Sequence, residues 1–120
     1  MSTDPAVLDP SAFERLERIG GQRLVERMVE TFSGFAQEKV SEIEDACRDQ
    51  RWQDAGVAAH ALKSSAGNIG ATTLQRLSFE VEQAGKAQDS AATPSLVLEL
   101  LEAYGAVQAA LARQFPDGEA

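Results

Sequence analysis

The sequence predicts an all-α fold: an antiparallel up-down-up-down four-helix bundle with a short N-terminal helix that covers one end. Ala, Leu, Glu, Gln and Arg are abundant, whereas Val and the aromatic residues are few, and this composition favours helix over strand. Apolar residues return every three or four positions in successive segments, as they do in helices with one buried face. Short connections separate these segments, which is typical of antiparallel neighbours in a bundle.

The N-terminal half is predicted to hold a short helix and a long one. Residues 1–8 are expected to be a loose lead-in, and Asp9-Pro10 predicts an N-cap followed by proline at the first helical position. The short helix buries Phe13, Leu16 and Ile19 and stops at Gly20-Gly21. A long helix over residues 22–50 follows, and its buried stripe comprises Leu24, Met28, Phe32, Phe35, Lys39 or Val40, Ile43 and Cys47.

Three more helices are predicted in the second half. The first follows a turn at residues 51–54 and ends near Asn68 to Gly70, where glycine can take the left-handed conformation. Thr72 or Thr73 is expected to cap the next, which runs to about Gln88, and Thr93-Pro94 repeats the cap-plus-proline start for the last. The buried stripes of these two comprise Leu74, Leu77, Ser78, Val81 and Ala84, then Leu96 or Val97, Leu100, Leu101, Tyr104, Val107, Leu111 and Phe115. Residues 116–120 are expected to fray, and residues 1–120 form a single domain.

Composition excludes several classes of function. With 19 acidic and 11 basic side chains the chain carries a net charge of −8, which argues against binding nucleic acid or an anionic membrane. No signal peptide is recognised and no segment approaches the ~20 apolar residues of a membrane span, so we expect a cytoplasmic monomer. The single Cys47 excludes an internal disulfide, and its place on an apolar stripe favours a buried structural thiol.

His60, the only histidine, is predicted to project from the outer face of its helix. At ~100° per residue the apolar side chains of this helix share one sector, and His60 points about 150° away from the centre of that sector. Its outer-face neighbours are Gln53, Gly56, Val57, Lys63, Ser64 and Gly67. Each glycine inside a helix costs about 1 kcal/mol relative to alanine, so this face breaks local rules, as functional sites do. The small residues are expected to leave the imidazole uncovered.

Charge around His60 is expected to be neutral or positive. No Asp or Glu occurs between Asp54 and Glu80, while Lys63 and Arg76 lie inside that window. A phosphoryl dianion meets little repulsion in such surroundings, so an exposed nucleophilic nitrogen beside an ammonium is suited to carry one. On the neighbouring helix, Glu82 and Gln83 are the candidates to approach the imidazole.

The pattern His60-x-Leu62-Lys63-x-Ser65-x-x-x-Ile69-Gly70-Ala71 resembles the signature of histidine-containing phosphotransfer (HPt) domains, the shuttles of multistep two-component signalling. The resemblance implies a four-helix bundle in which His60 is reversibly phosphorylated and Lys63 steadies the phosphate. Ser64 stands where the family usually has glycine and is still small. The expected partner-access surface is Gln53, Gly56, Val57, Ser64, Gly67 and Asn68.

The resulting hypothesis is a phosphocarrier rather than an enzyme. It takes a phosphoryl group from a phospho-aspartyl receiver domain and passes it to another response regulator, or takes it back. Neutral imidazole, with a reference pKa of about 6.5, is available as the nucleophile. The sequence offers no carboxylate cluster for magnesium near His60 and no nucleotide-binding glycine loop, so no cofactor is expected on this chain. Magnesium is expected on the receiver domain.

Two alternatives stay open at this point. The chain resembles the phosphoacceptor module of chemotaxis-type histidine kinases as well, or it is a helical adaptor in which His60 is incidental. The dimerising hairpin of ordinary sensor kinases is disfavoured, because Ala61 rather than an acidic residue follows His60 and no proline occurs between His60 and Pro94. Phosphorylation of Ser64 or Ser65 is also disfavoured, since Ser65 leans toward the helix interface as a packing residue.

Overall fold

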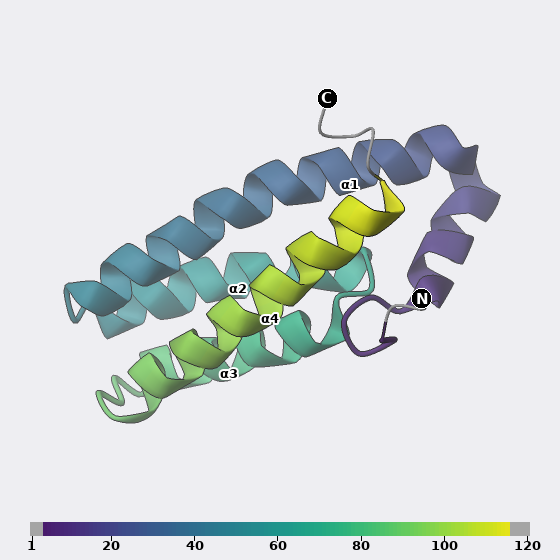
Figure 1. Ribbon diagram of the computed structural model, residues 1–120. Coiled ribbons are helices and arrows are strands. Elements are labelled where there is room, and N and C mark those ends of the chain that lie inside the picture. Colours follow the sequence, from purple (N-terminus) through teal and green to yellow (C-terminus); the bar gives the residue numbers. More distant parts are fainter. Residues whose placement is uncertain (1–3, 116–120) are drawn as a thin grey trace.

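The computed structural model describes residues 4–115, which form four α-helices and, over this range, no β-strand. They are α1 (Pro10–Arg48), α2 (Trp52–Asn68), α3 (Thr72–Lys86) and α4 (Ala92–Gln114). The prediction of an all-α fold is therefore confirmed for the described residues. In Figure 1 the long part of α1, α2, α3 and α4 lie roughly along one axis, and each helix runs opposite to the one before it. α2 packs against both α1 and α3, and α4 packs on α3 and closes back onto α1.

Helix α1 begins as predicted and contains a break. An Asp9 carboxylate oxygen accepts a hydrogen bond from the Ser11 amide at 3.0 Å, and Pro10 occupies the first turn. Gly21 has φ 73° and ψ −172°, a conformation that residues with a Cβ avoid, and Figure 1 shows the helix axis turning sharply near this point. The predicted stop at Gly20-Gly21 thus coincides with a sharp kink, although the structure assigns both sides of it to one element. The long part ends at Arg48 rather than Gln50.

The segment before α1 is docked on the bundle. Leu8 is buried in the core, and the Ala6 carbonyl accepts hydrogen bonds from the Thr73 amide at 3.0 Å and the Thr72 hydroxyl at 2.9 Å. The prediction that residues 1–8 are loose is therefore wrong for residues 4–8, because a buried leucine and two hydrogen bonds to α3 hold them. Residues 1–3 and the predicted frayed tail at 116–120 lie outside the described residues.

Two predicted threonine caps are also wrong. The N-cap of α3 is Ala71 without a side-chain cap bond, since the Thr72 hydroxyl bonds to the lead-in segment instead. Helix α4 begins at Ala92, where a carboxylate oxygen of Asp89 accepts from the amides of Ala91 and Ala92 at 3.0 and 2.9 Å. Thr93 is buried inside the first turn. A tertiary contact, which a local capping rule does not see, decided the first position, whereas the local side chain of Asp89 takes the capping role at the second.

The buried stripe of α1 lies one residue away from the predicted one over much of its length. Leu24, Met28 and Cys47 are half-buried, while Phe35 and Ile19 are exposed. The side chains that α1 buries beyond the kink are Val25, Val29, Phe32, Ala36, Val40, Ile43 and Ala46. Apolar residues occupy two adjoining columns of this helix, and packing against α2 and α4 selected the column with smaller side chains.

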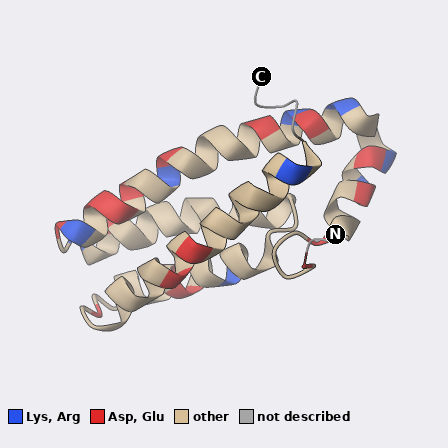
Figure 2. Ribbon diagram, in the orientation of Figure 1, with Lys and Arg blue, Asp and Glu red and all other residues tan. Residues whose placement is uncertain are grey.

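Charged residues are distributed unevenly over the bundle. Figure 2 shows acidic and basic residues along α1, whereas most of α4 carries neither. Among the described helices, α4 alone is long and apolar enough to cross a membrane by length and composition, which corrects the expectation that no segment approaches such a span. Its face with Val97, Leu100, Tyr104 and Val107 is buried in the bundle, and core helices of this kind pass the same test. This helix is therefore weak evidence for a membrane location.

Candidate functional site

His60 lies near the middle of α2, and its ring faces outward as predicted. Ala59 and Leu62 on the opposite side of the helix are fully buried, whereas the His60 side chain is 63% exposed. The helical period accounts for the outward direction of His60, because each residue turns the side-chain direction by about 100° about the helix axis from that of the buried residue before it. The ring is therefore accessible to another molecule.

A buried carboxylate on α3 organises the site. An oxygen of Glu82 lies 2.7 Å from His60 Nδ1, and its other oxygen accepts a hydrogen bond from Lys63 Nζ at 2.8 Å. Lys86 Nζ lies 3.7 Å from the oxygen that contacts His60. The Glu82 side chain is only 6% exposed. Buried charges occur almost always with partners, and Glu82 has an imidazole and two ammonium groups.

The charge state of Glu82 follows from these partners. The hydrogen bond from Lys63 holds the pKa of Glu82 below its ordinary value, although burial acts in the opposite direction, and the bond from His60 adds to the lowering. The carboxylate is therefore ionised near neutral pH. An ionised carboxylate only accepts hydrogen bonds, so Nδ1 of His60 carries the proton. In the neutral ring the lone pair then lies on Nε2.

The expectation that the surroundings of His60 are neutral or positive needs a correction, because the acidic Glu82, one of the two candidates on the neighbouring helix, contacts the ring. The acid-free window holds along the sequence but not in space, because the antiparallel packing of α2 and α3 brings Glu82 to the imidazole across 22 residues of sequence separation. The carboxylate contacts the buried side of the ring and is neutralised by lysines. The exposed side of the imidazole is thus still free of acidic contact among the described residues.

Most of the predicted access residues do lie on the outer surface. Gln53, Val57, Ser64 and Asn68 are exposed, with Val57 70% exposed one turn before His60. A hollow of about 510 Å³ adjoins the ring, and the residues that line it are Gln53, Asp54, Gly56, Val57, His60, Glu82 and Lys86. An apolar valine beside an exposed imidazole offers a partner protein both a contact and a route to the nitrogen.

The two glycines of the predicted surface serve a different purpose. Gly56 is buried against α3, and a Cβ there would come within 3.2 Å of the Glu82 carbonyl oxygen. At Gly67 a Cβ would lie 2.4 Å from Nε2 of Gln75. The missing side chain at Gly56 therefore lets α3 approach α2 closely, and the hypothesis that it leaves open space around the ring is incorrect there. At Gly67 the neighbouring space is taken by the end of the flexible Gln75 side chain.

Sequence reasoning named Glu82 only as one of two candidates and missed Lys86. A signal existed: Glu82 follows Leu74 and Ser78 at four-residue steps along the buried side of α3, and a carboxylate on an apolar stripe needs a partner. Gln83, the other candidate, is exposed. Lys63 contacts the carboxylate that holds the ring, and its Nζ also lies 5.2 Å from the centre of the Phe79 ring.

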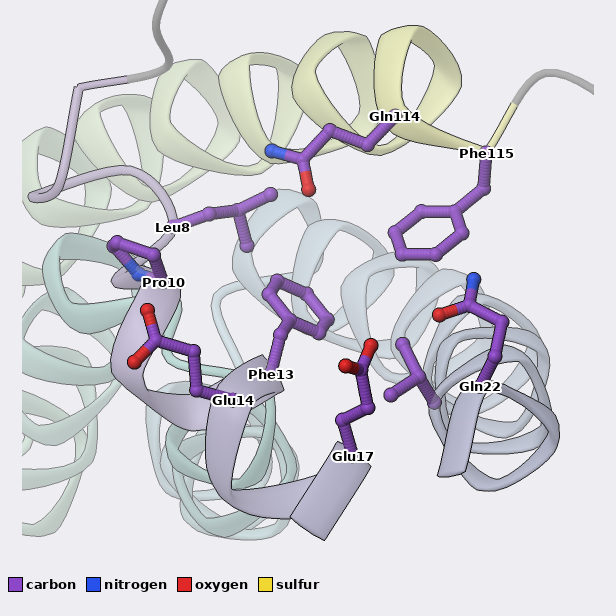
Figure 3. Close-up of a pocket in the computed structure, with 9 residues that line it drawn as sticks. Leu8, Pro10, Phe13, Glu14, Glu17, Gln22, Gln114 and Phe115 are labelled. Carbon is purple, nitrogen blue, oxygen red and sulfur yellow. The ribbon is translucent and has the colours of Figure 1, made fainter. Parts of the chain in front are cut away.

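A second hollow, of about 560 Å³, lies away from these residues. It is formed where the start of α1, the helix beyond the Gly21 kink and the end of α4 meet, and Figure 3 shows Phe13 and Phe115 facing each other across it. Their ring centres are 5.7 Å apart. In residues 4–115 no group of three or more His, Cys, Asp or Glu side chains is arranged to hold a metal ion.

Comparison with known proteins shows which family and which fold this chain resembles. A family model described as Hpt domain matches residues 27–110, which is well over half of the chain and includes His60, Lys63, Glu82 and Lys86. A crystal structure of histidine-containing phosphotransfer protein B (HptB) from Pseudomonas aeruginosa PAO1 is similar, with a TM-score of 0.83 and 18% sequence identity, over 90% of this chain and 93% of that one. At this identity the likeness concerns the fold. No curated protein matches the sequence.

Proposed function

Because this chain belongs to the Hpt domain family, we propose that it carries a phosphoryl group on His60 between a phospho-aspartyl receiver domain and another response regulator. The observation that supports this most directly is the exposed imidazole whose Nδ1 is held by the buried Glu82. The family match covers this residue pair, and histidine phosphotransfer is the activity of the family. The direction of net transfer and the choice of receivers are part of the proposal.

The transfer step can be written with the groups in place. The Nε2 lone pair attacks phosphorus, an N–P bond forms, and the P–O bond of the acyl phosphate breaks so that the donor aspartate leaves as carboxylate. Nδ1 keeps its proton, and the resulting phosphorylated imidazolium is balanced by the Glu82 carboxylate at 2.7 Å. Onward transfer reverses these bond changes on a second receiver. Phosphoryl transfer depends mainly on positioning and charge, which a rigid helical face supplies.

Lys63 is proposed to stabilise the phosphoryl group. Its ammonium lies one helical turn after His60 and is held 2.8 Å from Glu82, so it is close to the ring before phosphorylation. Gln53, Val57, Ser64 and Asn68 are proposed to form the surface on which a receiver domain docks, with Gly56 and Gly67 shaping the backbone beneath it.

The remaining catalytic groups are assigned to the partner. We propose that magnesium is bound by the receiver domain and that this chain contributes neither a metal nor a nucleotide site. Residues 1–120 are proposed to act as a single domain built on the up-down-up-down bundle, with the segment before the Gly21 kink covering one end. It is proposed to act as a cytoplasmic monomer, which cell fractionation and light scattering can check.

Incubation with a phosphorylated receiver domain tests the proposal. We expect a phosphate on the wild-type protein that is labile in acid and stable in base, and its loss in His60→Gln. Since His60 is the only histidine, a phosphohistidine label can be assigned to this residue. Equal binding of the receiver by both proteins, with no label on either, would instead support an adaptor.

Incubation with ATP alone is the second arm. A phosphocarrier stays unlabelled under these conditions, whereas self-labelling of the purified chain would favour a part of a histidine kinase. Lys63→Ala is expected to slow transfer from the receiver without abolishing it, and an unchanged rate would remove Lys63 from the site.

A further inference from the structure

We propose that Lys86 of α3 is a second cation for the phosphoryl group on His60, in addition to Lys63, which keeps its hydrogen bond to Glu82. This inference rests on the proposed function. The chain has three lysines, and two of them, Lys63 and Lys86, converge on the one buried carboxylate beside the ring. Lys86 also lines the hollow next to His60, whereas Lys63 does not.

The two lysines extend from backbone positions on opposite sides of His60 along α2. Lys63 lies one turn after His60 on the same helix. Lys86 comes from the antiparallel helix α3, where its backbone nitrogen would be 3.6 Å from a Cβ at Gly56, and so it lies one turn before His60. A phosphoryl group on Nε2 would therefore have one lysine side chain starting from each side of it along α2.

The close crossing of α2 and α3 is what brings Lys86 to this place. A Cβ at Gly85 would lie 2.5 Å from the Trp52 carbonyl oxygen and 2.9 Å from Gly56 Cα. Backbone therefore packs on backbone at this point, and the residue after Gly85 starts close to the hollow beside the imidazole. A larger residue at either glycine would move Lys86 away from His60.

The two lysines differ in how firmly they are held. Lys63 is 26% exposed, donates to Glu82 at 2.8 Å and lies over the Phe79 ring, so moving its ammonium breaks good contacts. Lys86 is 69% exposed and 3.7 Å from the carboxylate, beyond hydrogen-bond distance. Lys86 thus turns to a new anion at lower cost, and Lys63 can continue to neutralise Glu82.

Other charges facing this hollow do not replace Lys86. Asp54 lines the same hollow, and its carboxylate is paired with Arg51 at 2.8 Å. With both lysines present, the phosphoryl dianion and Glu82 together carry three negative charges against two ammonium groups and one imidazolium. Removing Lys86 leaves one negative charge in excess at the phosphate.

The test uses the protein phosphorylated chemically with phosphoramidate, which requires no partner. The titration of the phosphoryl group is followed by ³¹P NMR over about pH 5.5 to 9, a range that brackets a phosphate second pKa near about 6. A neighbouring ammonium favours the dianion, so the wild type titrates at the lowest pH. We expect Lys86→Ala to raise the midpoint by about 0.2 to 0.7 pH units, the size that exposed ion pairs reach, and Lys86→Arg to restore it.

Lys39→Ala is the matched control, because this third lysine pairs with Glu42 on α1 and should leave the midpoint unchanged. The effect of Lys86→Ala should shrink at about 1 M salt, where screening acts over about 3 Å. A midpoint in Lys86→Ala equal to that of wild type, with a shift in Lys63→Ala, overturns the role of Lys86 and leaves the carrier function standing. Failure of wild type to take up phosphate on His60 from phosphoramidate or a phosphorylated receiver overturns both.

Discussion

The contact between α2 and α3 at Gly85 provides a sharp test of how the site is built. In Gly85→Ala the new Cβ would lie 2.5 Å from the Trp52 carbonyl oxygen and 2.9 Å from Gly56 Cα, distances that real Cβ atoms essentially never show. These neighbouring atoms belong to the backbone, so the contact cannot be relieved by moving a flexible side chain. The two helices must therefore separate or the turn before α2 must shift.

Two terms set the size of the effect. Alanine is favoured over glycine inside a helix by about 1 kcal/mol, and overpacking of a well-packed site costs about 1–3 kcal/mol. Because rigid backbone meets the new methyl group, we expect the upper part of that range and a net loss of about 1–2 kcal/mol in the free energy of unfolding. Phosphotransfer to His60 should slow as well, since Glu82 and Lys86 move with α3.

Gly105→Ala is the matched control. Gly105 lies within α4, and a Cβ there would meet nothing within 4 Å. The same substitution should stabilise the protein there by about 0.5–1 kcal/mol. Urea unfolding of both variants measures the comparison, and the helix propensity gain cancels in the difference between them. Equal stability of Gly85→Ala and Gly105→Ala would refute the argument that backbone contact between the helices holds the site.

Four further outcomes follow from the described contacts. The pKa of Glu82 is lowered in the folded protein, so the stability that its carboxylate contributes is complete above the unfolded pKa near 4.5 and is lost as pH falls through the folded pKa. In urea unfolding, the difference in the free energy of unfolding between wild type and Glu82→Gln should therefore shrink on acidification. A difference that stays constant with pH would contradict this prediction. Thr93→Val should stabilise by about 1 kcal/mol, because the buried Thr93 hydroxyl has no hydrogen-bond partner within residues 4–115; a loss of stability in thermal unfolding would speak against this. Gly21→Ala should cost about 1–2 kcal/mol because φ is 73° there, while Gly34→Ala, which meets no neighbour, should not destabilise. Ser64→Leu should slow transfer from a receiver while helicity by circular dichroism is unchanged, and an unaltered rate would exclude this face from docking.

Local rules were sufficient for much of the helix layout. Asp9-Pro10 begins α1, Gly21 breaks it, and Gly70 with φ 77° lies in the turn after α2, because capping, proline geometry and left-handed backbone depend on the residue and its immediate neighbours. The outward direction of His60 follows equally from the 3.6-residue period, since its neighbours Ala59 and Leu62 had to be buried. The relative position of His60 and Lys63 could be predicted as well, because both residues lie on one helix.

What the sequence alone determined about this protein is therefore a helical chain with one exposed imidazole and a lysine a turn away. Only the tertiary structure decided what surrounds that imidazole: Glu82 in contact with the ring, Lys86 beside that carboxylate, and glycines that let α2 and α3 touch. The physical reason is that charge and steric contact act through distance in space. An acid-free stretch of sequence carries no information about a carboxylate that an antiparallel neighbour brings within 2.7 Å.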